Sequence, residues 1–358
     1  MSAHEILILV MAVFAVLGAL DRIFGNRFGL GKQFEEGILA MGSLALAMLG
    51  IIVIAPVLAQ VLRPVIVPVY TFLGADPSMF AGTILACDMG GGALAKELTT
   101  DPQAAALGGV LCGSMLGATI VFTIPVAMGI LHEKDRPYLA KGVLAGIVTV
   151  PVGVFVGGLV AGFEVMMVLR NLVPVILIGA LIALGLVLAE KAMIKGFGIF
   201  GKAVIILITI GLVASIFETL TGYVIIPGLA PIEDGFMTVG SIAIVLAGAF
   251  PLVLVLTKLL KKPLMAFGRL LRINETAAAG LIASLANSIA TFGMVKDMDH
   301  RGKVVNIAFA VSAAFVFGDH LGFTAGFAPQ LLPAMILGKL AGGVSAVAVA
   351  LVLTRKKA

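Results

Sequence analysis

The sequence predicts an all-α polytopic membrane protein with two inverted repeats, about nine membrane spans and two re-entrant or broken-helix hairpins. Three observations predict this fold: the composition, an internal match at a constant offset, and the positions of the basic residues. Of the 358 residues, 61% are hydrophobic and only 12% are charged, whereas soluble domains contain about 25% charged residues. A soluble chain cannot bury so much apolar surface, so the composition excludes a soluble enzyme, a disordered protein and a nucleic-acid binder.

Nine stretches are apolar enough, and long or nearly long enough, to cross a bilayer as helices. The hydrocarbon core is about 30 Å thick, and a helix needs about 20 apolar residues to span it. The predicted spans are 4–20, 37–60, 102–131, 138–161, 165–189, 202–220, 236–258, 303–323 and 331–353.

Two further stretches, 77–97 and 275–297, are apolar but carry polar residues at their centres. The first contains Asp88 shortly before three glycines, and the second contains Asn287 followed by Ser288. A continuous helix facing lipid does not tolerate such centres, whereas a broken helix buried in protein does. We therefore expect both stretches to form re-entrant hairpins or broken helices.

The chain contains an internal repeat at an offset of 198 positions. The segment FEEGILAMGSLAL at 34–46 matches IEDGFMTVGSIAI at 232–244, including an acidic pair and a Gly-Ser pair. The offset persists over roughly 80 residues, although any two apolar helices share some small residues. The match predicts repeat 1 at 1–161, a connecting span within 162–198, and repeat 2 at 199–358.

The basic residues predict the orientation, because Lys and Arg concentrate on the cytoplasmic side of membrane proteins. If both hairpins return to the side they entered, most of the 24 basic residues lie inside, with the N-terminus outside and the C-terminus inside. If both hairpins cross, three basic clusters are exported instead: Arg22/Arg27/Lys32, Lys296/Arg301/Lys303 and Arg355/Lys356/Lys357. The first arrangement makes the repeats inverted, and inverted repeats with broken helices are typical of secondary transporters.

Ionisable residues within membrane segments are costly and are therefore candidates for function. Asp88 is the first candidate, because it lies at the centre of the first hairpin, where a carboxylate can pair with a cation. The alternative interpretation is that Asp88 only caps the following helix. Asp319 and His320, late in the span 303–323, form a second candidate pair that responds to protons. The alternative interpretation is that both side chains lie at the outer end of the span and are hydrated by water among the lipid headgroups.

Neutral polar residues complete the predicted site. Ser284, Asn287 and Ser288 in the second hairpin offer hydrogen bonds to a hydroxyl or an amine, or else only cap the hairpin tip. Thr119 matches Asp319 in the repeat and is a lesser candidate. Phe315, Phe317 and Phe323 flank the second pair and can hold an ammonium by cation–π attraction, although simple packing also explains them. No catalytic residues, metal site or cofactor are predicted, because the sequence contains no nucleotide-binding, nucleophile-elbow or metal-ligand motif.

The long segment from Asn274 to Gly326, NETAAAGLIASLANSIATFGMVKDMDHRGKVVNIAFAVSAAFVFGDHLGFTAG, resembles the bacterial ethanolamine permeases of the ethanolamine-utilisation system. CDMGGG at 87–92 is similar to the same family, and the resemblance covers essentially the whole chain. It implies a multi-pass carrier in the bacterial cytoplasmic (inner) membrane that imports ethanolamine for catabolism. It assigns no binding residues, and the site given above comes from the residues alone.

The resemblance fits the predicted site, because ethanolamine is largely a cation at neutral pH. Its binding within the membrane should therefore require a buried carboxylate. Its partners would be ethanolamine as the transported substrate and the lipid bilayer, with no nucleic acid; a homo-oligomer is also compatible with the sequence. Other readings are a carrier for another small cation or a nucleoside-like solute, a channel, or a membrane-embedded enzyme using Asp319 and His320. The sequence leaves open whether transport is facilitated or coupled to protons or sodium.

Overall fold

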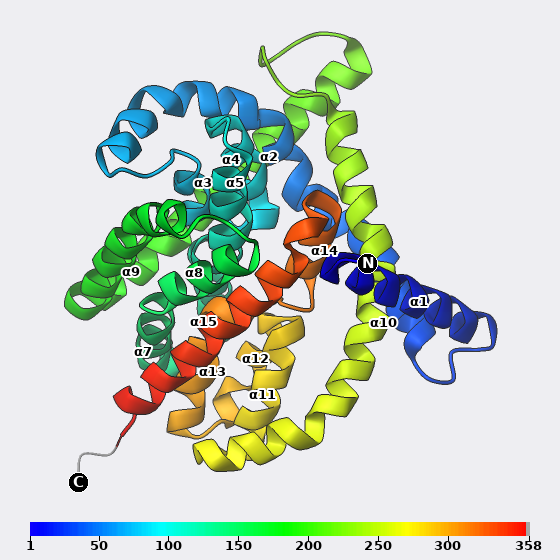
Figure 1. Ribbon diagram of the computed structural model, residues 1–358, viewed down its shortest axis with the longest axis vertical. Helices are drawn as coiled ribbons and strands as arrows, with labels where there is room; N and C mark the ends of the chain where they lie inside the picture. The colour runs from blue at the N-terminus through cyan, green and yellow to red at the C-terminus, as the bar shows by residue number, and fades with distance from the viewer. Residues whose placement is uncertain (356–358) are drawn as a thin grey trace.

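The structure, a computed structural model, describes residues 1–355, apart from the side chains of Leu260, Lys261, Leu264 and Phe267. Within the described residues, every regular element is a helix, and the elements form one helical assembly (Figure 1). In the part of the chain that the structure describes, seven helical stretches are long and apolar enough to cross a membrane: Ala3–Ile23, Leu30–Phe72, Pro102–Ile130, Glu133–Val160, Val165–Thr221, Ile232–Leu259 and Pro329–Leu353. The chain is therefore an all-α, multi-pass membrane protein, as predicted. Lys356 and Lys357, part of the predicted inner cluster, lie outside the described residues.

The first half of the chain begins with α1 (Ala3–Ile23) and the long helix α2 (Leu30–Phe72). α2 contains the predicted span 37–60 and continues through Pro56, Pro64 and Pro68. A broken element follows, comprising α3 (Met79–Ile84), the wide turn η1 (Cys87–Gly91) and α4 (Gly92–Leu98). The predicted interruption at 77–97 is present, because Leu85 and Ala86 are extended and separate α3 from η1.

The next span, predicted at 102–131, is one continuous but widened helix. It consists of α5 (Pro102–Ala105), the π-helical segments η2 (Ala106–Gly117) and η3 (Thr119–Thr123), and α6 (Ile124–Ile130). Such π-helical turns are rare and occur frequently at functional sites. The short turn η4 (Glu133–Asp135), α7 (Arg136–Ile147) and α8 (Val150–Val160) form the following span.

The helix α9 (Val165–Thr221) joins the two halves and differs from the prediction. Two spans, 165–189 and 202–220, were expected with a connection between them. The structure instead has a 57-residue helical element interrupted only at Ala189, where φ is −146° and ψ is 50°. Residues 190–201 are helical as well, so the connection between the two predicted spans is a kink at Ala189 and not a loop.

The second half contains α10 (Ile232–Leu271), followed by a second broken element comprising α11 (Glu275–Ala286), α12 (Ser288–Met294) and η5 (Val295–Asp297). The break lies at Asn287, as the sequence predicted. α13 (His300–Ala313), α14 (Asp319–Phe327), η6 (Pro329–Leu331) and α15 (Leu332–Leu353) complete the chain.

The predicted continuous span 303–323 is not continuous. It is divided into α13 and α14 by the non-helical residues 314–318, and Phe315 has a positive φ of 62°. This break is held by the second broken element, because the Phe315 amide donates to the Ser284 carbonyl at 3.0 Å and the Phe317 amide donates to the Leu285 carbonyl at 2.8 Å. Backbone groups of two interrupted helices thus satisfy each other.

α2 and α10 pack against each other through two corresponding glycines. A Cβ on Gly37 would overlap the backbone at Leu246 and Ala247, and a Cβ on Gly235 would overlap the side chain of Leu49. Small residues let helix backbones approach closely inside a membrane. The two glycines therefore set the distance between the two longest helices of the two halves.

A second pair of glycines fixes the outer helices. Gly50 of α2 packs directly on the backbone carbonyl of Ile208 in α9, and Gly248 of α10 packs directly on that of Met11 in α1. Each of these two long helices is consequently in close backbone contact with one span from the opposite half of the chain.

Candidate functional site

Asp88 lies in the wide turn between α3 and α4, where the helix is interrupted. Within this turn Met89 has φ −106° and ψ 39°, and Gly90 has φ 98°. A positive φ favours glycine, and a Cβ on Gly90 would also overlap the side chain of Ile51 in α2. Gly90 therefore allows the turn that presents the Asp88 side chain, which is 15% exposed.

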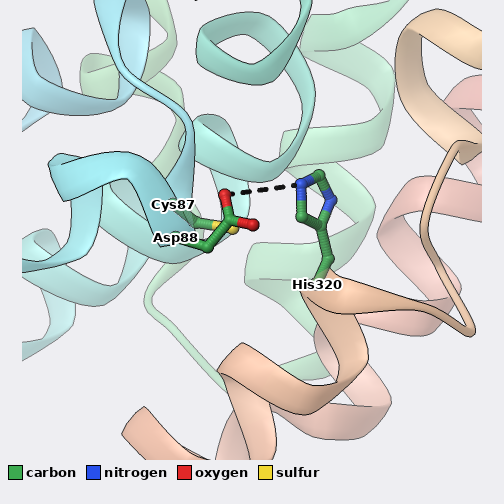
Figure 2. Close-up of side chains that lie close together, drawn as sticks. All are labelled: Cys87, Asp88 and His320. Carbon is green, nitrogen blue, oxygen red and sulfur yellow. Dashed lines mark ion pairs between the residues drawn. The ribbon is translucent and has the colours of Figure 1, made fainter. Parts of the chain in front are cut away.

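His320 faces Asp88 from the other half of the chain. It follows the break 314–318, lies in the first turn of α14 and is 3% exposed. Its Nε2 atom lies 3.8 Å from Asp88 Oδ1 (Figure 2). Two helix interruptions that are far apart in the sequence thus place a carboxylate and an imidazole side by side.

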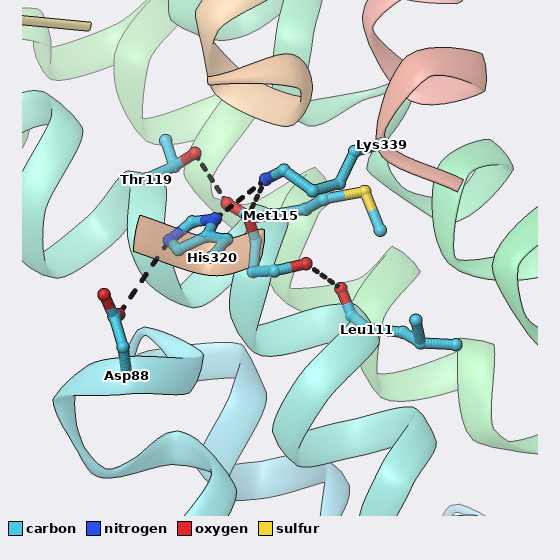
Figure 3. A network of polar contacts seen from close by, with 7 residues as sticks. Asp88, Leu111, Met115, Thr119, His320 and Lys339 are labelled. Atoms are coloured by element: carbon cyan, nitrogen blue, oxygen red, sulfur yellow. Dashed lines mark hydrogen bonds and ion pairs between the residues drawn. The ribbon is translucent and has the colours of Figure 1, made fainter. Parts of the chain in front are cut away.

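Lys339 of α15 completes this group from the opposite side of the imidazole. Its side chain is 1% exposed, and its Nζ atom lies 3.0 Å from His320 Nδ1 and donates to the Ser114 carbonyl of η2 (Figure 3). A lysine ammonium only donates hydrogen bonds, so Nδ1 of His320 accepts. The proton of the neutral imidazole is then on Nε2, which faces Asp88.

Sequence reasoning did not select Lys339 as a site residue. The available signal is that Lys339 is the single charged residue in the apolar predicted span 331–353. Among the described residues, its ammonium has no carboxylate within 4.0 Å. Buried charges in proteins are ordinarily paired, and here the connection to Asp88 runs through the imidazole.

A cavity of about 180 Å³ lies at this group. It is lined by polar side chains and by alanine, leucine, methionine and phenylalanine side chains: Ser43, Leu44, Ala47, Ala86, Asp88, Met89, Ala118, Phe122, Phe315, Asp319 and His320. A water molecule occupies about 30 Å³ in the liquid. The cavity therefore has room for a solute of a few non-hydrogen atoms together with water.

The charges and rings of the cavity favour a small cation. Asp88 and Asp319 bring two carboxylates to its wall, and the Phe122 and Phe315 rings meet edge to face with centroids 5.5 Å apart. The Phe315 ring also lies 5.2 Å from the His320 ring. Carboxylates attract an ammonium, and aromatic faces add cation–π attraction. Of the three predicted phenylalanines, Phe315 lines this cavity, whereas Phe323 stacks on Phe327 instead.

A larger cavity of about 490 Å³ adjoins the first one. Four residues line both cavities: Ser43, Ala47, Met89 and Phe122. From there the larger cavity extends between α2, η3, α6 and α9 to Lys202. Met89 and Phe122 thus separate the space beside Asp88 from a wider opening lined by α9.

Cys87, Asp88 and His320 also bring three atoms that could ligate a metal within 4.8 Å of one another. A metal-bound histidine must offer a free ring nitrogen. With Lys339 charged, however, the His320 Nδ1 lone pair accepts the Lys339 hydrogen bond and Nε2 carries the proton. The donor set therefore does not suit a metal in this arrangement.

The remaining predicted residues lie apart from the cavity lining. The Thr119 hydroxyl is buried and lies 2.8 Å from the Met115 carbonyl and 3.1 Å from the Val311 carbonyl, so it connects η3 to α13. Ser284 Oγ lies 2.8 Å from Thr291 Oγ1, and Asn287 Oδ1 caps α12 by accepting from the Ile289 amide at 2.8 Å. The Ser288 hydroxyl is buried and has no hydrogen-bond partner among the residues that the structure describes. None of these four residues lines the cavity beside Asp88.

The helical fold and this charged cavity between interrupted helices are those of a multi-pass membrane protein and suit a transporter. The chain belongs to the family described as "Ethanolamine utilisation protein, EutH", whose sequence profile matches residues 3–353. The family predicted from the residues 87–92 and 274–326 is thereby confirmed.

Curated relatives cover nearly the whole chain. A "Probable ethanolamine permease EutH" of Listeria monocytogenes is 62% identical over 99% of this chain and 95% of its own length. The protein of the same name in Escherichia coli is 51% identical over 100% of this chain and 97% of its own. The "Uncharacterized protein YxeR" of Bacillus subtilis is 52% identical over 99% and 96%. No solved structure matches the chain. The permease names denote transporters and not enzymes, in agreement with the sequence prediction.

Proposed function

We propose that this protein is a carrier that imports ethanolamine, bound as its ammonium form, across the bacterial inner membrane for catabolism. The observation that carries the proposal is the placement of Asp88 in an aromatic-lined cavity at a helix break. The names of the relatives, probable ethanolamine permeases, support the choice of substrate. Another small cation is the alternative that the same carboxylate would serve.

In the proposed complex, Asp88 binds the substrate ammonium and the rings of Phe122 and Phe315 surround it. Asp319 adds negative charge at the cavity wall. The Ser43 hydroxyl already donates to the Ala40 carbonyl at 2.9 Å, so its oxygen can accept a hydrogen bond from the substrate hydroxyl. The carboxylate then binds the ammonium of the amino alcohol, the aromatic rings surround the ammonium, and the Ser43 oxygen accepts from the hydroxyl.

His320 and Lys339 act on the same carboxylate in this proposal. The Lys339 charge is connected to Asp88 through the His320 ring. An entering ammonium provides Asp88 with a closer positive partner. The other predicted residues (Thr119, Ser284, Asn287 and Ser288) position the breaks around the cavity and do not touch the substrate.

The two halves, repeat 1 at 1–161 and repeat 2 at 199–358, are proposed to be inverted repeats, joined by the connecting segment 162–198. Reciprocal contacts support the repeat, and the positions of the basic residues support its inversion. Gly37 and Gly235 differ by 198 positions, as do their partners Leu49 and Ala247. Exchange of the two halves therefore maps one contact onto the other, which is the signature of a two-fold relation.

Alternating access follows from this architecture in other carriers with inverted repeats. Here the wider cavity reaching Lys202 is the proposed route to the cytoplasm, with the N-terminus outside and the C-terminus inside. Met89 and Phe122, which line both cavities, stand on this route. Labelling single cysteines introduced at Ser2 and at Lys195 from each side of the membrane tests the orientation: Ser2 is expected to react from outside and Lys195 from inside, and the reverse pattern would contradict it.

The proposal is tested by uptake of labelled ethanolamine into proteoliposomes containing the full chain. Wild type is compared with Asp88→Asn, Asp319→Asn and the control Glu233→Gln, an exposed carboxylate at the start of α10. Saturable uptake by wild type and by the control, with loss in Asp88→Asn, is expected. Absence of uptake by wild type would refute the substrate, and unchanged uptake by both aspartate variants would refute the carboxylate site.

A further inference from the structure

A third cavity, of about 840 Å³, lies away from Asp88 at one end of the helix assembly. It is enclosed by the start of α7, the start of α13 and the ends of α10 and α15. In Figure 1 the end of α15, coloured red, marks this region beside α13. Four basic side chains line it: Lys141, Arg272, Arg301 and Arg355.

The positive charge of this cavity is not neutralised by the protein. None of the four basic side chains has a carboxylate within 4.0 Å among the residues that the structure describes. The carboxylate in the lining, Asp299, is already engaged, because it accepts from the Asn274 amide at 2.9 Å and from the Gly302 amide at 3.3 Å. The cavity therefore presents a net positive potential to an anion.

Hydrogen bonds to the fold hold the side chain of one of the arginines, Arg301, in place. Arg301 donates from Nη1 to the Leu271 carbonyl at 3.2 Å, at the end of α10, and from Nε to Thr354 Oγ1 at 3.4 Å. Within the described part of the chain, its Nη2 atom has no hydrogen-bond partner and is available to an anion. Arg272 terminates α10 with φ 57° and ψ 47°, a left-handed conformation that is uncommon for residues other than glycine.

An apolar surface continues directly from the basic cavity. An adjoining cavity of about 480 Å³ shares Arg272, Arg301 and Arg355 and extends to Leu270 and Val352. These two apolar side chains are 76% and 68% exposed. The position is also at the end of an apolar span, since α15 ends at Leu353 and charged residues follow. A ligand that fits this surface has an anionic head and apolar chains.

We propose that this cavity binds the phosphate of an anionic phospholipid, with the acyl chains lying along Leu270 and Val352. Basic pockets between transmembrane helices are known to hold such headgroups. Lys141 belongs to α7 and the three arginines to the second half of the chain, so one headgroup would bridge the two halves. The cavity is separate from the ethanolamine site, and the proposal is independent of the transported substrate.

The test uses the purified full chain in detergent, with lipid binding measured by native mass spectrometry. The probes are phosphatidylglycerol, phosphatidylcholine with the same acyl chains, and inorganic phosphate. The variant Lys141→Gln/Arg355→Gln removes two exposed charges, and Lys191→Gln/Lys195→Gln removes two exposed charges at the α9 kink as the control. Wild type is expected to prefer phosphatidylglycerol over phosphatidylcholine. The cavity variant is expected to lose affinity for phosphatidylglycerol about tenfold or more, and the control variant much less.

Equal binding of the two lipids by wild type would overturn the proposal, as would equal losses in the two double variants. Inorganic phosphate that displaces phosphatidylglycerol at equal concentration would assign the cavity to a soluble phosphate instead. If the cavity variant does not fold, the lipid preference of wild type is measured at increasing salt. A preference that falls steeply with salt supports the basic cavity, and one that is unaffected by salt contradicts it.

Discussion

Lys339 donates a hydrogen bond to His320 at 3.0 Å although both side chains are almost completely buried. The other nitrogen of the same ring faces Asp88 at 3.8 Å. A buried ammonium and a buried carboxylate are thus joined through one imidazole at the junction of three helical segments from both halves. The positive charge of Lys339 therefore affects how strongly Asp88 binds a cation.

Replacement of Lys339 by Met should therefore tighten ethanolamine binding while slowing its transport. Removal of a positive charge near Asp88 favours a cationic ligand, by on the order of tenfold in affinity, and a more tightly held substrate is released more slowly. Equilibrium binding and proteoliposome uptake of labelled ethanolamine measure the two effects. Weaker binding in Lys339→Met would show that Lys339 supports the site only by holding His320.

Gly90→Ala should destabilise the turn that presents Asp88. The alanine would have to adopt φ near 98° and would overlap Ile51, and the left-handed conformation alone costs about 1–2 kcal/mol. Gly42→Ala is the matched control, because no atom lies within 4 Å of a Cβ at that position. Thermal unfolding of the purified variants measures the difference, and equal stability of the two variants would contradict the assigned role of Gly90.

The buried ion pair between Asp135 and Lys303 should be costly to break from either side. Lys303 Nζ lies 2.5 Å from Asp135 Oδ1, and the two side chains are 9% and 1% exposed. Either Asp135→Asn or Lys303→Met alone leaves one buried charge unpaired, which costs about 3–5 kcal/mol. The double variant should lose much less than the sum of the two single variants. Additive losses in thermal or denaturant unfolding would show that the pair is not energetically coupled.

Gly50 and Gly248 pack on carbonyls of neighbouring helices, and alanine at either position should destabilise the protein by a similar amount. Gly50→Ala would crowd Ile208, and Gly248→Ala would crowd Met11 in the corresponding place of the other half. Overpacking of this kind costs about 1–3 kcal/mol. Gly240→Ala, at a position with nothing within 4 Å, should be tolerated. A large loss in only one of the two variants would weaken the proposed correspondence of the halves.

The sequence predicted the features that follow from local chemistry. The sequence alone predicts the apolar stretches, the interruptions near Asp88 and Asn287, and the family. These features depend on polar residues and glycines inside apolar segments, which can be recognised without knowing the tertiary structure. The break at 314–318 was not predicted, since the surrounding residues are apolar and the break depends on hydrogen bonds with Ser284 and Leu285. A tertiary contact of this kind leaves no periodic signal.

The site was predicted in part for the same reason. Asp88, Asp319 and His320 line one cavity, because each is an ionisable residue in an apolar segment and was recognised as such. Ser284, Asn287 and Ser288 were chosen from the matching hairpin, but their groups serve the hairpin itself. Lys339 and Ser43 come from helices distant in the sequence, and only the packing of α15 and α2 brings them to the site.

Equilibrium binding of labelled ethanolamine to the purified protein tests the central claim, that the Asp88 carboxylate binds the ammonium. Wild type, Asp88→Asn and the exposed control Glu233→Gln are compared after size-exclusion chromatography has established that each is folded. Loss of one partner of a desolvated charge pair costs about 2–5 kcal/mol, so Asp88→Asn is expected to bind about 30-fold more weakly or worse, with the control unchanged. Binding by folded Asp88→Asn at wild-type affinity would contradict the account.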